Sequence, residues 1–326
     1  MAHVLILGNI HAAGLAVLAA RADVTVEQVA AASEAELIRR VPGADAILVR
    51  TNRVSGPVIE AAPRLRIVSR HGVGYDNVDL AALDRRGIPL TVVGDVNAVP
   101  VAEQTLYLML ALAKQAIAYD RATRSGGWAI RDSFAATELA GKTLLLLGFG
   151  RIGRAVAVRA QAFGMQVAAY DPYVPAAAVT AVGCRPVSAL DEAFGSADYV
   201  SVHLPLSADT RNIIDASALT RMKRSAILIC TARGGLVDEA ALAKALEARA
   251  LRAAGLDVFA DEPPAADNPL LGRADVLLSP HTAALTQECA IRMAEISARN
   301  VLAGLDGRLD PALVVNGPAV ATAKRA

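Results

Sequence analysis

The sequence predicts an α/β protein built from two doubly wound, parallel-sheet domains. Short apolar runs alternate with helical patterns along most of the chain, which is typical of parallel strands joined by crossover helices. The 326 residues suit two domains of ordinary size, each able to bury its own core. Residues 143–171 add the pattern of a dinucleotide site, and such sites occur in doubly wound sheets.

The first hundred residues are expected to form one of these sheets. Apolar runs predict strands at residues 3–7, 46–49, 67–69 and 90–93. Helical patterns lie between them at residues 34–40, 57–61 and 80–86, and a turn and a helix should follow the first strand. Because strands and helices alternate, the strands should be parallel.

Residues 101–118 predict a long helix that is apolar on nearly every side. Such a helix must be buried, so we expect it between domains or between subunits. Residues 124–138 are polar and irregular, and we interpret them as a surface connection that leads into the next strand.

The alternation resumes in the second half of the chain. Strands are predicted at residues 143–147, 166–170, 199–203, 226–230, 253–258 and 276–278. Helices are predicted at residues 152–162, 188–194, 239–249 and 287–302. The tail from residue 306 is short, and we expect no further domain from it.

Gly148, Gly150 and Gly153 follow the strand at residues 143–147 with the spacing GxGxxG. The first glycine permits a tight turn, the second lets the backbone approach a pyrophosphate, and the third allows a helix to pack closely on the strand. The N-terminus of the helix that follows would offer free N–H groups to the phosphates. This context of strand, turn and helix predicts a dinucleotide site.

Asp171 lies 18 residues after Gly153, at the end of the second strand of this unit. A carboxylate at that position can accept a hydrogen bond from a ribose 2′-OH. It would repel the 2′-phosphate of NADP, and no Arg or Lys follows it in residues 172–174. NAD is therefore the expected cofactor.

Charge and composition exclude several classes of partner. The chain has 33 basic and 32 acidic residues, so no nucleic-acid partner is expected. The chain has no apolar run of 18 residues, and its N-terminus lacks the basic start of a signal peptide, so no membrane span is expected. Cys184, Cys230 and Cys289 are far apart, so they predict neither a disulfide framework nor a metal site, and they suit the cytoplasm.

Three polar residues follow predicted strands of the second half of the chain. They are Arg233, Glu262 and His281, each a few residues beyond the end of its strand. Ligands of doubly wound sheets bind outside the carboxyl ends of the strands. A lone charged residue in a loop is usually solvated, but three at successive strand ends beside a dinucleotide site are candidates for a functional site.

Seven stretches of the chain match one known family. They are RHGVGYDNVDL (70–80), NAVPVAEQTLYLMLAL (97–112), ELAGKTLLLLGFGRIG (138–153), VHLPLSADTRNII (202–214), TARGGLVDE (231–239), GLDVFADEP (255–263) and SPHTA (279–283). With these motifs the sequence resembles the D-isomer-specific 2-hydroxyacid dehydrogenases, whose members include D-3-phosphoglycerate dehydrogenases and hydroxypyruvate reductases. The stretches occur in the family's order and span most of the chain.

The resemblance implies a particular arrangement of the two domains. A Rossmann NAD-binding domain, residues 100–284, would be inserted in a flavodoxin-like substrate domain made of residues 1–99 and 285–326. It also implies a homodimer, with the helix of residues 101–112 at the interface.

The resemblance further implies an NAD-dependent oxidoreductase that interconverts a D-2-hydroxy acid and its 2-oxo acid, of 3-phosphoglycerate, glycerate/hydroxypyruvate or glyoxylate type. His281 would act as the general acid and base at the reacting oxygen, which suits a side chain whose ordinary pKa is about 6.5. Glu262 would hold the other ring nitrogen. Arg233 would grip the substrate's oxygens with a fork geometry that lysine lacks.

Further binding residues are implied by the same resemblance. On the cofactor side they are Gly148, Phe149, Gly150, Arg151, Ile152, Gly153, Asp171, His203, Pro205, Thr231, Ala232, Asp257 and Ala283. On the substrate side they are Arg50, Val73, Gly74 and Asn97. Backbone N–H groups of Val73 and Gly74 would hold the substrate carboxylate. Arg50 would meet a phosphate or a second acidic group, or would be a solvated arginine; His11 and His71 are interpreted as structural or surface residues.

Two alternative functions stay open at this point. One is an NAD(H)-sensing regulatory binding protein, similar to the family's transcriptional corepressors, which keep the fold and the three catalytic residues. The other is a formate dehydrogenase, which the resemblance implies would have Gln in place of Glu262 and is therefore disfavoured. Cys230 and Leu145 depart from the family's pattern, and we expect them to change packing near the cofactor but not the reaction.

Overall fold

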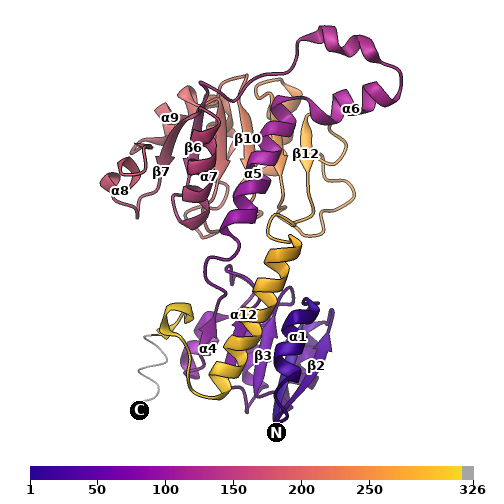
Figure 1. Ribbon diagram of the computed structural model, residues 1–326, viewed down its shortest axis with the longest axis vertical. Coiled ribbons are helices and arrows are strands. Elements are labelled where there is room, and N and C mark those ends of the chain that lie inside the picture. The colour runs from indigo at the N-terminus through magenta and orange to yellow at the C-terminus, as the bar shows by residue number, and fades with distance from the viewer. Residues whose placement is uncertain (318–326) are drawn as a thin grey trace. The chain divides into compact units, whose positions relative to one another are not determined.

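The computed structural model describes residues 1–317 and divides into two compact units (Figure 1). The N-terminal unit contains residues 1–97 and the described residues from 285 onward. The central unit contains residues 98–284.

The N-terminal unit holds a parallel sheet with the strand order β2-β1-β3-β4-β5. Its strands are β1 (Ala2–Leu7), β2 (Val24–Val29), β3 (Ala46–Val49), β4 (Ile67–Arg70) and β5 (Leu90–Thr91). Its helices are α1 (Ala12–Ala19), α2 (Glu34–Arg40), α3 (Gly56–Glu60), α4 (Leu80–Arg85) and α12 (Gln287–Leu305), with short 3-10 turns at Val41–Gly43 and Pro311–Leu313. This strand order is that of a flavodoxin-like doubly wound sheet, which confirms the predicted fold class.

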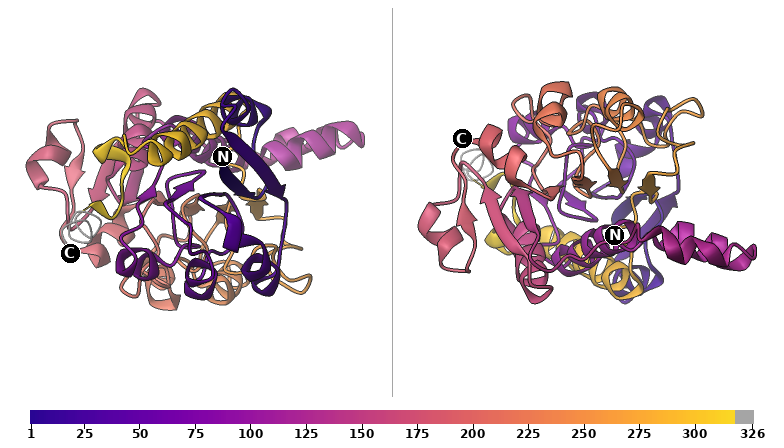
Figure 2. Two further views of the ribbon diagram at one scale, coloured as in Figure 1. Left: turned by 90° about the horizontal axis from the view of Figure 1, so that it is seen from below. Right: turned by 90° about the horizontal axis from the view of Figure 1, so that it is seen from above.

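Helices cover both faces of this sheet, as the left view of Figure 2 shows. On one face α1 and α12 bury Leu18, Ala298 and Val301 against the strands. On the other face α2, α3 and α4 supply a second apolar core. The C-terminal helix therefore completes a sheet that the first hundred residues begin.

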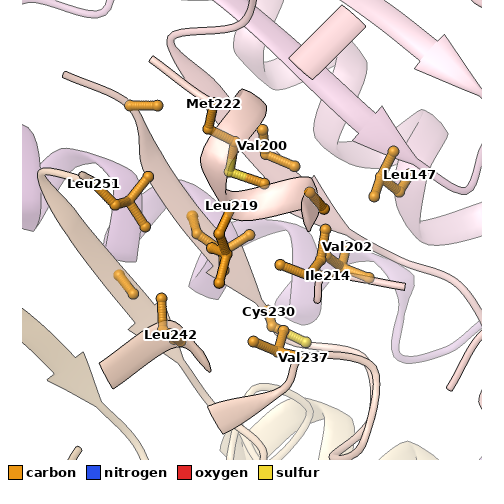
Figure 3. Packing of buried hydrophobic residues seen from close by; sticks show 14 of the residues in the cluster. Leu147, Val200, Val202, Ile214, Leu219, Met222, Cys230, Val237, Leu242 and Leu251 are labelled. Atoms are coloured by element: carbon orange, nitrogen blue, oxygen red, sulfur yellow. The ribbon is translucent and has the colours of Figure 1, made fainter. Parts of the chain in front are cut away.

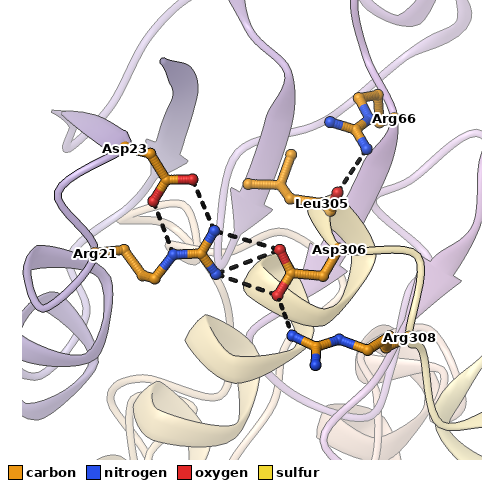
Figure 4. Close-up of polar contacts among 6 residues, drawn as sticks. All are labelled: Arg21, Asp23, Arg66, Leu305, Asp306 and Arg308. Atoms are coloured by element: carbon orange, nitrogen blue, oxygen red, sulfur yellow. Dashed lines mark hydrogen bonds and ion pairs between the residues drawn. The ribbon is translucent and has the colours of Figure 1, made fainter.

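An ion-pair network ties the end of α12 to the connection between α1 and β2 (Figure 4). The Arg21 guanidinium contacts Asp23 at 2.7 Å and Asp306 at 3.1 Å, and Arg308 also pairs with Asp306. Hydrogen bonding from Arg21 lowers the pKa of Asp23 to about 2 and holds the pKa of Asp306 below its ordinary value. Because Arg21 is half-buried and its partners are exposed, solvent reaches the network, which contributes modestly to stability and is weakened by salt.

The central unit holds a second parallel sheet with the order β12-β11-β10-β9-β6-β7-β8. Its strands are β6 (Thr143–Leu147), β7 (Gln166–Tyr170), β8 (Arg185–Pro186), β9 (Tyr199–Val202), β10 (Ile227–Cys230), β11 (Ala253–Leu256) and β12 (Val276–Leu278). Its helices are α5 (Ala98–Ala113), α6 (Ala116–Arg124), α7 (Arg151–Ala162), α8 (Ala176–Thr180), α9 (Leu190–Ser196), α10 (Ala216–Arg221) and α11 (Glu239–Glu247), with a 3-10 turn at Trp128–Ser133. This is the Rossmann order extended by one strand, as predicted.

Aliphatic side chains fill the two cores of the central unit. Figure 3 shows the core under α10 and α11, where Leu219 and Leu242 meet residues of the sheet. Cys230 belongs to this core, and burial raises the pKa of its thiol to about 11. The cysteine that departs from the family's pattern is thus a packing residue.

The predicted helix 101–118 is wrong in its extent, because the chain breaks after α5. Gln115 has a left-handed backbone with φ of 55°, and α6 begins at the next residue. The carbonyl of Ala113 accepts a hydrogen bond from the N–H of Thr137 at 2.8 Å, so the returning chain satisfies the end of α5. None of the nine described residues of α6 is buried, and Figure 1 shows it extending away from the sheet of its unit.

Two edge strands, β2 and β8, were not predicted from the apolar runs of the sequence. The strand β2 lies at the sheet edge, and five of its six residues, all except Val29, are exposed or half-buried. β8 is also an edge strand and has two exposed residues. Edge strands lack the continuous apolar run of a buried parallel strand, so this pattern does not predict them. Within residues 1–317, no helix is both long and apolar enough to cross a membrane.

Candidate active site

The loop between β6 and α7 has the geometry of a dinucleotide loop. A Cβ atom at Gly153 would lie 2.2 Å from the carbonyl oxygen of Gly148, so only glycine allows this approach of helix and strand. A Cβ atom at Gly150 would meet nothing within 4 Å, which leaves room for a ligand at the N-terminus of α7. Arg151 and Ile152 form the first turn of that helix. The loop therefore fits a pyrophosphate on free N–H groups.

Asp171 lies against this loop. Leu147 and Tyr170, the last residues of β6 and β7, pair in register. The residues that follow them, Gly148 and Asp171, are therefore neighbours. The Asp171 carboxylate accepts hydrogen bonds from the N–H of Phe149 at 2.8 Å and of Tyr173 at 3.0 Å. These bonds hold a negative charge beside the opening at Gly150.

His203 follows β9 at the same sheet edge, next to β6. Its Nε2 contacts the hydroxyl of Ser201 at 2.9 Å, while its buried Nδ1 has no partner among the described residues. Burial lowers the pKa of His203 to about 4, so the ring is neutral at pH 7. A buried nitrogen without a partner is costly, so a ligand group at this position would be stabilising. Pro205, two residues later, is exposed.

The three predicted catalytic residues come from the ends of β10, β11 and β12. Nδ1 of His281 lies 2.7 Å from Oε2 of Glu262, which leaves Nε2 for a substrate. The other Glu262 oxygen accepts a hydrogen bond from the N–H of Phe259 at 3.1 Å. Burial raises the pKa of Glu262, but the hydrogen bond and charge of His281, the Phe259 N–H and the charge of Arg233 together hold it below its ordinary value. The positive charge of Arg233 thus lies close enough to Glu262 to stabilise its carboxylate.

Arg233 is placed by a close backbone approach. After β10 the chain runs through Thr231 and Ala232, whose carbonyl accepts a hydrogen bond from Nη1 of Arg233 at 2.7 Å. A Cβ atom at Gly234 would lie 1.6 Å from the carbonyl oxygen of Phe259. Since no side chain fits there, the loop that carries Arg233 lies directly on the backbone that leads to Glu262.

Asp257 organises the loop of His281. Its fully buried carboxylate accepts hydrogen bonds from the Ser279 hydroxyl at 2.5 Å and from the N–H groups of Thr282 and Ala283, both at 2.9 Å. The N–H of His281 donates to the carbonyl of Asp257 at 2.7 Å. His281 has φ of 51°, an uncommon conformation for this residue type that persists where its surroundings enforce it.

A cavity of about 440 Å³ adjoins Glu262 and His281. Glu262, Ser279 and His281 line part of it, and its other lining residues, which include Phe259, Leu271 and Pro280, are apolar. Such a cavity, with a few polar groups in an apolar wall, suits a small organic ligand.

The predicted substrate-binding residues belong to the N-terminal unit, whereas the three predicted catalytic residues belong to the central unit. Arg50 follows β3, and its Nη1 donates to the carbonyl of Asn9 at 2.7 Å. Val73 and Gly74 lie in the loop after β4, and Asn97 ends the first segment of the unit.

His71 was interpreted as structural or surface, and the structure places it next to Arg50. Val49 and Arg70 pair in register, so Arg50 and His71 are the next pair and lie on the same face of the sheet. His71 is buried, and its Nε2 has no partner among residues 1–317. Burial, followed by the charges of Arg50 and Arg70, lowers the pKa of His71 to about 4. In the sequence, the position of His71 two residues before Val73 could have indicated that it belongs to the substrate-binding loop.

A family model supports what the geometry indicates. Residues 106–283 match the model described as "D-isomer specific 2-hydroxyacid dehydrogenase, NAD binding domain". The chain therefore belongs to the D-isomer specific 2-hydroxyacid dehydrogenase family, which confirms the resemblance seen in its motifs and NAD as the predicted cofactor.

Individual relatives agree with this assignment. The chain is 45% identical over 286 residues to a D-3-phosphoglycerate dehydrogenase of Mycobacterium tuberculosis, a match that covers 87% of this chain and 54% of the relative. The chain thus spans about half the length of the curated relatives it matches. A protein from Thermus thermophilus superimposes with a TM-score of 0.87 at 36% identity, covering 96% of this chain and 99% of the other. A D-lactate dehydrogenase from Aquifex aeolicus, complexed with NAD and lactic acid, superimposes with a TM-score of 0.87 at 29% identity, covering 97% and 99%.

Proposed function

We propose that this protein is an NAD-dependent D-2-hydroxyacid dehydrogenase that interconverts a D-2-hydroxy acid and its 2-oxo acid. The observation that carries the proposal is the 2.7 Å contact between His281 Nδ1 and Glu262, with Arg233 beside it, at the carboxyl edge of the sheet that holds the dinucleotide loop. A base, a group that orients it and an anion-binding arginine are what this chemistry requires.

In this mechanism bound NAD(H) supplies or accepts the hydride. His281 holds a proton at Nε2 for the carbonyl oxygen of the oxo acid, and takes the hydroxyl proton in the opposite direction. Glu262 fixes the orientation of the ring through Nδ1. Arg233 holds the carboxylate and carbonyl oxygens, so that the reacting carbon keeps one orientation.

The substrate is proposed to carry a second anionic group, as 3-phosphoglycerate does. In the order β2-β1-β3-β4-β5 the connections reverse direction between β1 and β3, and ligands of such sheets bind at this switch point. Arg50 lies at the end of β3, and its hydrogen bond to the neutral Asn9 carbonyl does not neutralise its charge. The adjoining His71 nitrogen has no partner among the described residues, and an oxyanion would supply one.

A cytoplasmic homodimer is also part of the proposal. In the segment of residues 114–137, Trp128 is 66% exposed and Phe134 is 87% exposed. These two side chains and Tyr119 line an apolar cavity. On α5, Val99 and Tyr107 are also exposed. Apolar surface of this extent is typical of a protein interface, and a second copy of the chain is the partner that the family resemblance implies.

The first experiment is NADH oxidation against a panel of 2-oxo acids, with His281→Ala as the control. We expect turnover of at least one of hydroxypyruvate, 3-phosphohydroxypyruvate and glyoxylate, and its loss in His281→Ala with NADH binding retained. Tight NADH binding without turnover of any acid would instead favour the NAD(H)-sensing regulatory protein.

The substrate class is tested by comparing 3-phosphohydroxypyruvate with hydroxypyruvate, which differ by the phosphate. Arg50→Gln should lower the preference for the phosphorylated acid by about 30-fold, from roughly 2 kcal/mol for a hydrogen bond to a charged group. Arg53→Gln, an exposed arginine three residues later, is the matched control. An unchanged preference in Arg50→Gln would remove the anion site from the proposal while leaving the dehydrogenase in place.

A further inference from the structure

Two consecutive residues of α5 contact the two loops that carry the catalytic side chains. Nε2 of Gln104 donates to the hydroxyl oxygen of Ser279 at 3.1 Å, in the loop of His281. The hydroxyl of Thr105 lies 3.0 Å from that of Thr231, at the start of the loop of Arg233. All of these residues belong to the central unit.

The first link has a fixed direction. A carboxylate can only accept hydrogen bonds and a serine hydroxyl has a single hydrogen, so Ser279 must donate to Asp257 at 2.5 Å. Its lone pairs then face the Gln104 amide, which is a donor. Gln104 therefore orients Ser279, and Ser279 holds the buried carboxylate around which the loop of His281 folds.

The second link is directional as well. The Thr105 hydroxyl donates its hydrogen to the carbonyl of Val101, one turn earlier, at 2.8 Å. In its contact with Thr231 it is therefore the acceptor, and Thr231 is the donor. Thr231 then offers lone pairs to any ligand, which suits an N–H donor such as the carboxamide of a nicotinamide.

Both links lie in surroundings where polar groups are costly. Thr105 and Asp257 are fully buried, and Leu108 and Met109 of the same helix belong to an apolar core. A helix that needed only to be packed would be served by apolar side chains, because replacing both partners of a buried hydrogen bond can be nearly neutral. Hydrogen bonds in such surroundings add orientation.

We propose that Gln104 and Thr105 are positioning residues for catalysis: Gln104 sets the loop of His281 through Ser279 and Asp257, and Thr105 sets the loop of Arg233 through Thr231. The inference rests on the proposed dehydrogenase function. One rigid helix thereby holds the proton donor and the anion-binding arginine in a common frame.

Kinetics test the proposal through the pattern of losses. Gln104→Leu and Ser279→Ala should each lower kcat about 10-fold, the size expected for one buried hydrogen bond, with NADH affinity changed less than kcat. The double variant should lose no more than either single variant, because both break the same chain of contacts. Thr105→Val should add its own loss to that of Gln104→Leu. Ser279→Thr keeps the hydroxyl and should restore most of the rate.

Glu103→Gln is the matched control, since Glu103 precedes Gln104 on α5 and its side chain is 60% exposed. It should leave kcat as in the wild type. Two results would overturn the proposal. One is that the losses of Gln104→Leu and Ser279→Ala add up in the double variant. The other is a lowered Tm with an unchanged kcat, which would show that the two residues only contribute to packing.

Hydrogen exchange gives a readout that does not require turnover. The amides of Thr282 and Ala283, which donate to Asp257, should exchange about 10-fold faster in Gln104→Leu and Ser279→Ala than in the wild type or Glu103→Gln. Unchanged exchange would overturn the role of Gln104. A wild-type protein that turns over no acid would overturn the proposed function, and the exchange rates would then still decide whether Gln104 holds this loop.

Discussion

Replacing Glu262 with Gln isolates what its second oxygen and its charge contribute to His281. In the structure both carboxylate oxygens accept hydrogen bonds, one from Phe259 N–H at 3.1 Å and the other from Nδ1 of His281 at 2.7 Å. Glutamine has a single acceptor oxygen, and its NH₂ group is a donor. Glu262→Gln can therefore keep both contacts only when Nδ1 of a neutral His281 is the acceptor, whereas a protonated His281 would place two donors against each other.

The magnitude follows from the kind of bond that is lost. A hydrogen bond to a charged group contributes about 1.5–3 kcal/mol. The side chains of His281 and Glu262 are 47% and 36% exposed, so solvent screens part of this energy. We therefore expect roughly 1–2 kcal/mol, which is about a 5- to 30-fold loss in kcat/KM.

The assay is the steady-state reduction of the preferred 2-oxo acid across pH 4 to 9 in the wild type, Glu262→Gln and Glu262→Asp. The pKa of Glu262 is lowered, so its charge is present above its ordinary pKa and is lost as the pH falls through the lowered value. The ratio of wild-type to Glu262→Gln activity should thus be constant from neutral pH down to about pH 5 and shrink below the ordinary carboxyl range. A Glu262→Gln enzyme with wild-type kcat/KM at pH 7 would refute the role given to this contact.

Three further outcomes are expected. Gly234→Ala should lower kcat/KM by more than 100-fold, because its Cβ would lie 1.6 Å from the Phe259 carbonyl and the loop of Arg233 must move; steady-state kinetics on a variant with a normal circular dichroism spectrum checks this. Asp171→Ala should weaken NADH binding while NADPH binding weakens less or improves, since the repelling carboxylate is gone; fluorescence titration with both cofactors measures the ratio, and an equal loss for both would contradict the assignment. Asp306→Asn should lower the Tm slightly in low salt, with the difference removed at 1 M NaCl, because solvent reaches both Asp306 and its half-buried partner Arg21; a difference that persists in high salt would show that the pair acts through packing.

Much of the fold was predictable because buried parallel strands have a recognisable local pattern. β6 and β10 consist of continuous apolar runs, and the sequence predicted both strands. The strand β2 was not predicted because, at the sheet edge, five of its six residues are exposed or half-buried and form no continuous apolar run. The break at Gln115 was not predicted because it depends on a distant contact. The carbonyl of Ala113 accepts a hydrogen bond from the N–H of Thr137, which is 24 positions further along the sequence.

The sequence by itself determined which polar residues follow predicted strands. Because the carboxyl ends of parallel strands lie at one edge of a sheet, these residues were expected to lie near one another. That rule made Arg233, Glu262 and His281 candidates, and the family resemblance implied their catalytic roles. Tertiary structure decided which residues hold them, as in the contact between Gln104 and Ser279, which are 175 positions apart. It also placed His71 beside Arg50, through the register of β3 and β4. Such partners meet through packing and register between separate elements, and neither leaves a periodic pattern in the local sequence.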